Sequence, residues 1–176
     1  YTAPQKQFRA RSEEEVLESI RLTGQRYGDQ IRRVFLADGD ALVLPTRRLL
    51  SILEAIRIHM PAVRRISSYC LPRNLRKKSQ ADIDELAAAG LTMAYVGAES
   101  GDDAVLAAVS KGETFDTTCE ALDKLGTAGI TRSVMILNGL GGTVLSEQHA
   151  DNSARLMNAA QPEFLSTLVV SFPMGE

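Results

Sequence analysis

The most informative part of this sequence is Val34-Phe35-Leu36-Ala37-Asp38-Gly39-Asp40-Ala41-Leu42. A short apolar run ends in an Asp-Gly-Asp turn, and a helix-forming segment resumes at Pro45. A run of this length bounded by turn residues is typical of a buried strand, and the segment after it is typical of the helix of a βα unit. We therefore expect the Asp-Gly-Asp turn at the carboxyl end of a strand, where parallel α/β proteins bind ligands.

The Asp-Gly-Asp turn has two interpretations. Gly39 lets the backbone approach a ligand closely, and the carboxylates of Asp38 and Asp40 can accept hydrogen bonds from a cationic group. The alternative is an ordinary solvated turn between a strand and a helix, in which the glycine provides only flexibility. The residues of this stretch leave both interpretations open.

The composition is that of one globular domain. The chain has 176 residues, of which 44% are hydrophobic and 24% are charged, which is enough for a sizeable core. The net charge of -2 and the pI of about 5.8 give no general attraction to nucleic acid or to an anionic membrane. No apolar run approaches the roughly 20 residues of a membrane span, and no signal peptide is visible. Because Cys70 and Cys119 are the only cysteines and lie far apart in the sequence, we expect a cytoplasmic protein.

The two ends of the sequence indicate a piece of a longer protein. The first residue is Tyr1 rather than methionine, and the last residues, Phe172–Glu176, directly follow an apolar strand. We therefore expect residues 1–176 to form a single core domain that is incomplete at both ends.

Strand-like and helix-like segments alternate along the whole chain. Apolar runs recur roughly every 30 to 40 residues with an amphipathic segment between each pair, which is the spacing of right-handed βα crossovers in a parallel sheet. The expected N-caps of the helices are Ser12, Thr46, Ser79, Thr114 and Ser146. The expected strands span Arg33–Ala37, Arg65–Tyr69, Thr92–Gly97, Ser133–Leu137 and Phe164–Phe172.

This alternation predicts an α/β fold. We expect a partial (βα) barrel of about five to six parallel strands, open and TIM-like, with the polar or glycine-rich strand ends on one rim. The alternative is a doubly wound sheet, because periodicity does not say which faces of the sheet the helices cover.

Two further strand ends carry candidate ligand-binding residues. Glu99 follows the strand Thr92–Gly97 together with Ser100, and a carboxylate at a barrel rim suits paired hydroxyl groups such as those of a ribose. The alternative is that Glu99 caps the helix that starts at Ala104. The glycines of Gly139–Gly142 follow a later strand and could cradle a nucleotide or, through backbone N–H groups, a phosphate.

The segment Gly139–Gly142 lacks the known nucleotide signatures. The residue three positions after Gly141 is Val144, so the spacing of a dinucleotide-binding fingerprint fails, and no Walker lysine follows. The alternative interpretation is a flexible loop between a strand and a helix.

The cysteines and histidines do not form a recognisable catalytic or metal motif. Cys70 ends a strand without Cys or His at metal-ligand spacing, so we interpret it as a small buried hydrophobic residue. Cys119 lies on an amphipathic segment, where core or half-buried packing is expected. His59 and His149 are isolated on helices, and we expect both to be solvated.

Three stretches, in this order and spacing, resemble the radical S-adenosylmethionine (radical SAM) superfamily. In that superfamily a CxxxCxxC loop after the first strand holds a four-iron four-sulfur cluster, and the sequence from Tyr1 resembles the segment directly after the third cysteine. These cysteines are absent from the sequence, and neither remaining cysteine replaces them. The stretches are Phe8-Arg9-Ala10-Arg11-Ser12-Glu13-Glu14-Glu15-Val16, Phe35-Leu36-Ala37-Asp38-Gly39-Asp40-Ala41-Leu42, and Tyr95-Val96-Gly97-Ala98-Glu99-Ser100-Gly101 with Lys111-Gly112.

The resemblance implies roles for individual residues. Asp38-Gly39-Asp40 resembles the motif that binds the methionine amino group of SAM. Glu99, with Ser100 beside it, lies where relatives place a Glu or Gln that faces the SAM ribose. Lys111 matches a basic residue that approaches the SAM carboxylate.

The resemblance extends to the strand before Asn138. Asn138-Gly139-Leu140 resembles the glycine motif beside the adenine. Several relatives have an acidic residue four positions before that glycine, where this chain has Met135. No second acidic ribose contact is therefore implied on this strand.

The resemblance implies an enzyme similar to an iron–sulfur oxidoreductase. Such an enzyme binds SAM and a four-iron four-sulfur cluster, takes an electron from a donor, and cleaves SAM to a 5′-deoxyadenosyl radical that removes hydrogen from a small-molecule substrate. The sequence does not identify the substrate, and without the cluster loop we expect the chain as given to be inactive. The alternative is a non-catalytic nucleotide- or phosphate-binding βα module without a cluster.

Overall fold

The computed structural model describes residues 10–171 and contains one sheet of five parallel strands in the order β1-β2-β3-β4-β5. Each strand lies beside its sequence neighbour, so every connection is a crossover that contains at least one helix. The strands are β1 (Arg33–Asp40), β2 (Arg65–Cys70), β3 (Leu91–Glu99), β4 (Thr131–Asn138) and β5 (Phe164–Val169).

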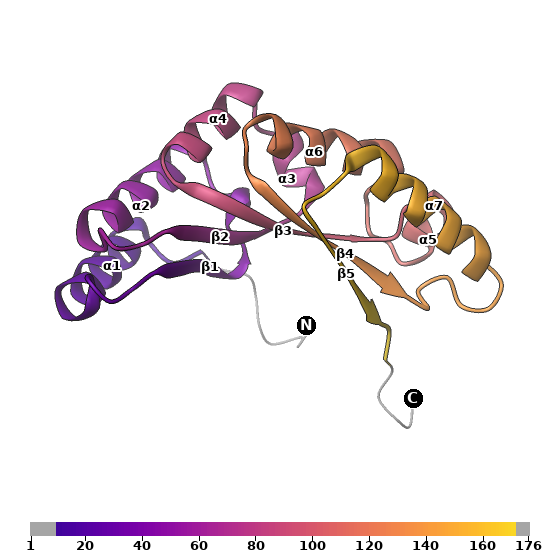
Figure 1. The fold of residues 1–176 in the computed structure, drawn as a ribbon, viewed down its shortest axis with the longest axis horizontal. Helices are drawn as coiled ribbons and strands as arrows, with labels where there is room; N and C mark the ends of the chain where they lie inside the picture. The colour runs from indigo at the N-terminus through magenta and orange to yellow at the C-terminus, as the bar shows by residue number, and fades with distance from the viewer. Residues whose placement is uncertain (1–9, 172–176) are drawn as a thin grey trace.

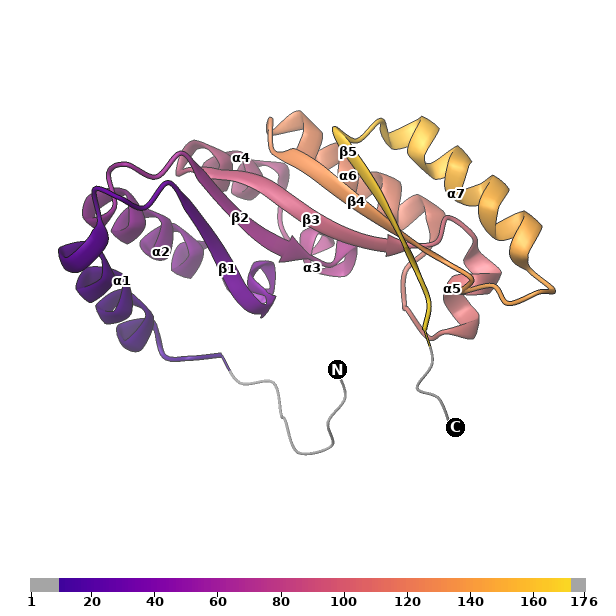
Figure 2. The same cartoon turned by 60° about the horizontal axis from the view of Figure 1, so that its bottom comes forward.

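The long helices cover one face of this sheet, and the other face is open (Figures 1 and 2). The sheet is curved and does not close, which confirms the expected open partial barrel and excludes a doubly wound sheet. The helices are α1 (Glu13–Tyr27), α2 (Thr46–His59), α3 (Pro72–Arg76), α4 (Gln80–Ala88), α5 (Asp103–Ala108), α6 (Phe115–Thr127) and α7 (Ser146–Ala160), with a 3-10 turn η1 (Ala41–Val43) after β1. Among them, no helix has the length and apolar character needed to cross a membrane.

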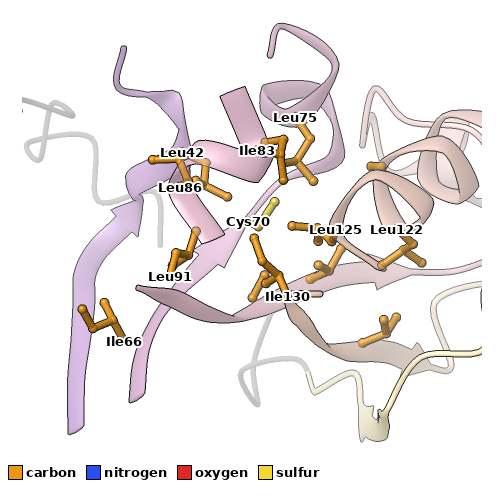
Figure 3. Close-up of a cluster of buried hydrophobic side chains, with 14 of the residues drawn as sticks. Leu42, Ile66, Cys70, Leu75, Ile83, Leu86, Leu91, Leu122, Leu125 and Ile130 are labelled. Carbon is orange, nitrogen blue, oxygen red and sulfur yellow. The ribbon is translucent and has the colours of Figure 1, made fainter. Parts of the chain in front are cut away.

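The core lies between the sheet and the helices. Alternate residues of the central strands point to this side, and large aliphatic side chains from the helices meet them (Figure 3). Cys70 lies within this cluster and is 2% exposed, which confirms it as a small buried residue. Burial raises the pKa of the Cys70 thiol, and the nearby Asp40 and Glu113 add to this effect. Cys119 is half-buried, as expected.

Helix capping was predicted correctly at three of its five sites. Ser12 forms a capping box with Glu15, and Ser79 and Thr114 cap α4 and α6 through their side chains. The prediction was wrong for Thr46 and Ser146, which are the first residues of α2 and α7 and follow N-caps without side-chain capping bonds. Thr46 instead receives a hydrogen bond from the Lys78 ammonium group at 3.4 Å. A tertiary partner therefore replaces the local cap at this position.

The boundaries of all five strands differ from those expected, by at most three residues at either end, and the largest differences are at the ends of β1 and β5. The Asp38-Gly39-Asp40 segment is part of β1 rather than a turn after it. Leu36 pairs with Ser68 and Asp40 pairs with the next residue of β2, so the three residues between them form a bulge. Asp38 and Gly39 have φ of 65° and 117°, the region that favours glycine. The last strand ends at Val169 instead of Phe172, which lies outside the described residues.

Candidate functional site

The carboxyl ends of all five strands lie along one edge of the sheet because the strands are parallel. This edge carries Asp38–Asp40 at the end of β1, Glu99 at the end of β3 and Asn138 at the end of β4. β1 and β3 are separated only by β2, so Asp40 and Glu99 lie about 10 Å apart in the direction across the strands. The edge therefore brings Asp38–Asp40 and Glu99 within reach of one nucleotide-sized ligand.

Glu99 and Lys111 form an ion pair at the centre of this edge. The Lys111 ammonium group donates to Glu99 Oε1 at 3.1 Å, and the two side chains are only 15% and 18% exposed. Lys111 reaches this position because its N–H donates to Leu106 O and closes the end of α5. Two residues that the sequence assigned to one ligand are thus in direct contact.

The backbone around Glu99 shapes this ion pair. Glu99 has a φ of 65°, and β3 has an irregular register with β4 between Gly97 and Glu99. The carboxylate folds back over Gly97, where an added Cβ would lie 2.5 Å from Glu99 Oε1. Hydrogen bonds between described residues use Oε1 of Glu99, which leaves Oε2 as an acceptor.

Glu99 does not cap the following helix. The N-cap of α5 is Asp102, whose Oδ1 accepts the N–H of Val105 at 2.9 Å. Burial alone raises the pKa of Asp102, and the hydrogen bonds from Val105, Asn152 and Gln148 outweigh it, so the pKa lies below its ordinary value. Asp102 is therefore the structural carboxylate of this loop, and Glu99 serves another purpose.

Ser100 is fully buried and contacts a histidine that was expected to be solvated. Its Oγ lies 2.7 Å from Nδ1 of His149, which is only 5% exposed. The prediction for His149 was wrong because α7 packs this residue against the loop after β3. The prediction for His59 was also wrong, since His59 is half-buried and its backbone packs against Gly24.

Asp40 is fully engaged within the protein. Its Oδ1 accepts the N–H of Leu42, and its Oδ2 accepts the N–H of Leu71 and the side-chain amide of Asn74, all three at 2.7 Å. Asp40 therefore ties the end of β1 to η1 and to the start of α3. The exposed Asp38 and the adjacent Gly39 are the parts of the bulge left to meet a ligand.

The bulge also borders a groove of about 370 Å³ between β1, α1 and α2. Arg11, Asp38 and Arg48 are among the residues that line it. The rest of the lining is mostly apolar and continues toward Ile56 and Met60. The bulge thus separates the rim from a groove on the helix side.

Asn138 and Gly139, at the end of β4, line a cavity whose lining does not include Glu99. Asn138 follows the same alternation as Val134 and Ile136, which point to the helix side. Together with Gly139 and His149 it lines a cavity of about 490 Å³ between α7 and β5. Met135 lies in register with Gly97, so it occupies the position on β4 nearest to the Glu99 carboxylate.

An aromatic cluster on the open face was not predicted. Phe35, Tyr69 and Tyr95 come from three neighbouring strands, with ring centroids 4.8, 5.6 and 6.3 Å apart. Phe35 is 39% and Tyr69 is 53% exposed. Strict alternation along each strand is the signal that could have identified them, since each lies on the face opposite to the core.

A buried carboxylate near Lys111 was also missed. Glu113 has a side chain that is 1% exposed, and its Oε1 accepts the N–H of Arg73 at 3.1 Å. The Arg73 guanidinium group lies 3.7 Å from the same oxygen and is half exposed. Glu113 therefore holds the start of α3 close to the segment that carries Lys111.

The described residues do not fit an iron–sulfur cluster. Within residues 10–171 there is no group of three or more His, Cys, Asp or Glu side chains that could hold a metal ion. Cys70 is in the core, and its Sγ faces Leu71 O at 3.7 Å. Clusters of this type require several thiolates close together. The described residues do fit the nucleoside and amino-acid parts of SAM, because a carboxylate and an ammonium group meet at the rim beside an open face.

Comparison with known proteins identifies relatives. A family model described as the radical SAM superfamily matches residues 1–157, which is most of the chain. A search of curated protein sequences gave no match.

Several solved structures share the fold. Coproporphyrinogen III oxidase (HemN) from Escherichia coli superposes with a TM-score of 0.70 at 13% identity, over 92% of this chain and 39% of its own. Methylornithine synthase (PylB) gives 0.69 at 17% identity, over 98% and 48%. The radical S-adenosylmethionine methyltransferase TsrM from Kitasatospora setae, with cobalamin and a [4Fe-4S] cluster bound, gives 0.71 at 19% identity, over 90% and 29%. The chain thus spans less than half the length of these proteins.

Proposed function

This chain belongs to the radical SAM superfamily, and we propose that its rim is the S-adenosylmethionine site of a radical SAM enzyme. The observation that carries the proposal is the contact between Glu99 and Lys111 at the carboxyl end of the central strand. The two residues were assigned to neighbouring parts of one ligand from the sequence, and they meet at 3.1 Å in a largely desolvated position. Such positions strengthen hydrogen bonds to a ligand because little water competes.

Each group of the pair has capacity left for the ligand. Oε2 of Glu99 can accept from a ribose hydroxyl, while Oε1 keeps its bond to Lys111. The Lys111 ammonium group has three donors, of which one is used by Glu99, and a second can bind the SAM carboxylate. The ion pair therefore orients the ribose and the methionine end together.

The β1 bulge would hold the methionine amino group. Because the Asp40 carboxylate is saturated by three donors, we assign this contact to the exposed Asp38 and the backbone carbonyl groups of the bulge. Gly39 permits their close approach, and Asp40 keeps the bulge in shape. Asn138 and Gly139 at the end of β4 would border the adenine.

The remaining components follow from family membership. When bound, a four-iron four-sulfur cluster and SAM supply radical chemistry, for which this chain's described residues provide no metal ligand. A small-molecule substrate would meet the open face, where the cluster of Phe35, Tyr69 and Tyr95 excludes water from the sheet. The same proposal includes an electron donor as a partner. It also includes an activity similar to that of an iron–sulfur oxidoreductase and a location in the cytoplasm.

The proposal is tested by SAM binding to the full-length protein with its cluster reconstituted anaerobically. Glu99→Ala removes a charged hydrogen bond, so the dissociation constant should rise at least about tenfold, or about 1.4 kcal/mol. Glu99→Gln keeps an acceptor and should lose less. The melting temperature should change little in both variants.

A matched control is available on α6. Glu120 pairs with Lys124 at 3.2 Å within α6, and neither residue belongs to the proposed SAM site, so Glu120→Ala removes a more exposed ion pair without touching the site. Its SAM affinity should equal that of the native protein. Normal SAM binding by Glu99→Ala would overturn the assignment, and equal binding of AMP and SAM without release of 5′-deoxyadenosine would favour a non-catalytic nucleotide module.

A further inference from the structure

Helix α7 forms several hydrogen bonds with the loop that follows Glu99. Ser100 Oγ is hydrogen-bonded to His149 at 2.7 Å, and the N–H of Gly101 donates to Ser153 Oγ at 3.0 Å. The Asn152 side chain adds a bond of 2.6 Å to Asp102 Oδ2. Because residues three and four apart share a helix face, one polar stripe of α7 makes all of these contacts.

The backbone of the loop and the backbone of α7 are in direct contact at Gly101, which leaves no room for a side chain between them. A Cβ added to Gly101 would lie 2.2 Å from the backbone oxygen of Asn152. Ser100 is 0% exposed and Asp102 is 5% exposed, so this loop is packed as tightly as the core. The loop position is therefore set by contacts with α7 together with hydrogen bonds inside the loop.

Ser100 transmits this constraint to Glu99. Its hydroxyl accepts the N–H of Asp102 at 3.0 Å, and we assign its proton to the bond with His149 Nδ1. Glu99, the residue before it, has a φ of 65°, an unfavourable conformation for a residue with a Cβ. Such a conformation persists only when the flanking residues are fixed, on one side by the β3 ladder and on the other by Ser100.

His149 is poorly explained as a stabilising residue alone. Its Nε2 is buried and has no hydrogen-bond partner among the described residues. With Nδ1 accepting from Ser100, the neutral ring carries its proton on Nε2, so a buried donor is left unpaired and destabilises the fold. The bond to Ser100 is the one polar contact this ring makes within the described residues.

We propose that His149 is a positioning residue for the SAM site, which acts through Ser100 to fix the backbone at Glu99 and so aims its carboxylate at the ribose. This inference rests on the function proposed above. It predicts that loss of the His149–Ser100 bond weakens SAM binding even where the fold is unharmed.

The test compares three variants of the full-length, cluster-reconstituted protein by SAM dissociation constant and melting temperature. His149→Phe keeps the ring volume and removes both nitrogens, so it should weaken SAM binding about fivefold while the melting temperature stays within a few degrees. His149→Asn restores a polar atom near the Nδ1 position and should bind SAM within about twofold of the native protein. Leu156→Ala is the control, since Leu156 is 0% exposed, packs in the core on the same helix and does not line the cavity beside Asn138, so it should lower the melting temperature without changing SAM affinity.

A double-mutant cycle with Glu99→Ala separates this inference from the proposed function. If His149 acts through Glu99, His149→Phe should change SAM affinity less than about twofold in the Glu99→Ala background. A fivefold effect in both backgrounds, a failure of Asn to restore binding, or an equal loss in Leu156→Ala would overturn the positioning role and leave the SAM site intact. Normal SAM binding by Glu99→Ala itself would remove the proposed function, and this inference with it.

Discussion

The carboxyl ends of β1 and β3 both carry an acidic residue within two positions of a glycine, yet the two carboxylates have opposite environments. Asp40 accepts three hydrogen bonds from its own chain, at the ends of other elements. Glu99 has one partner, Lys111, and keeps an oxygen for a ligand. Position at the rim is therefore not enough to assign a ligand-binding carboxylate. The number of internal donors that it already satisfies separates a structural carboxylate from a functional one.

The largest expected effect is the loss of stability in Asp40→Ala. The substitution leaves the N–H groups of Leu42 and Leu71 and the amide of Asn74 without their acceptor, so unfolding free energy should fall by about 3 kcal/mol. Glu99→Ala, at the same edge of the sheet, should lower it by less than about 1 kcal/mol. Urea denaturation followed by circular dichroism measures both.

Asp40→Asn provides the control for this pair. It keeps one acceptor oxygen and should recover part of the loss, while Glu99→Gln should be indistinguishable from the native protein in the same assay. Equal destabilisation by the two alanine variants would mean that Glu99 is as structural as Asp40, and the contrast between the two strand ends would be lost.

A third carboxylate, that of Glu163 at the opposite edge of the sheet, should contribute to stability as Asp40 does, because it also accepts three hydrogen bonds from its own chain. Glu163 accepts two hydrogen bonds from the Arg132 guanidinium group at 2.7 and 3.1 Å and a third from the Arg132 N–H at 2.6 Å. The hydrogen bonds from Arg132 outweigh burial and lower the pKa of Glu163 from 4.5 to about 2. Because the folded pKa is the lower one, the stabilisation is complete above pH 4.5 and is lost as the pH falls toward 2.

The expected size of this acid effect is modest. The Glu163 side chain is 44% exposed, so solvent screening reduces its contribution to about 1 kcal/mol. Glu163→Gln should therefore lower the free energy of unfolding by about 1 kcal/mol at neutral pH. Its free energy of unfolding should also change less between pH 4.5 and 2 than that of the native protein. A profile in that range that matches the native protein would show that the ion pair contributes nothing measurable.

Local patterns allowed much of the fold to be predicted. The capping boxes at Ser12 and Ser79 and the spacing of apolar runs depend on residues a few positions apart, and the structure contains the elements they predicted. The alternation of strands and helices could not show which face of the sheet the helices cover. That choice depends on how the helices pack against the sheet in the folded protein. The β1 bulge was mistaken for a turn because its residues have turn chemistry in both cases.

The candidate site was predictable only in part, for a related physical reason. Resemblance selected Glu99 and Lys111, but the saturation of Asp40 depends on Leu71 and Asn74, more than 30 positions away. Burial of His149 depends on Ser100, which is 49 positions away. A single sequence contains no local signal for such pairings, which is why His149 was expected to be solvated.

The smallest expected effects compare the glycines at the two strand ends. Gly39 has a φ of 117°, so Gly39→Ala places a Cβ in a strained conformation and should cost about 1 kcal/mol of stability. Gly97 has no such conformation, and the atom closest to an added Cβ is Glu99 Oε1 at 2.5 Å, the far end of a flexible side chain, with Lys111 Nζ at 3.7 Å. Gly97→Ala should therefore leave stability nearly unchanged and displace the carboxylate, which weakens SAM binding about threefold. Thermal denaturation and SAM titration of both variants measure the two losses. The contrast holds if Gly39→Ala melts lower while Gly97→Ala keeps the native melting temperature and binds SAM less tightly. A Gly97→Ala protein that melts lower but binds SAM normally would place the structural role at β3 as well.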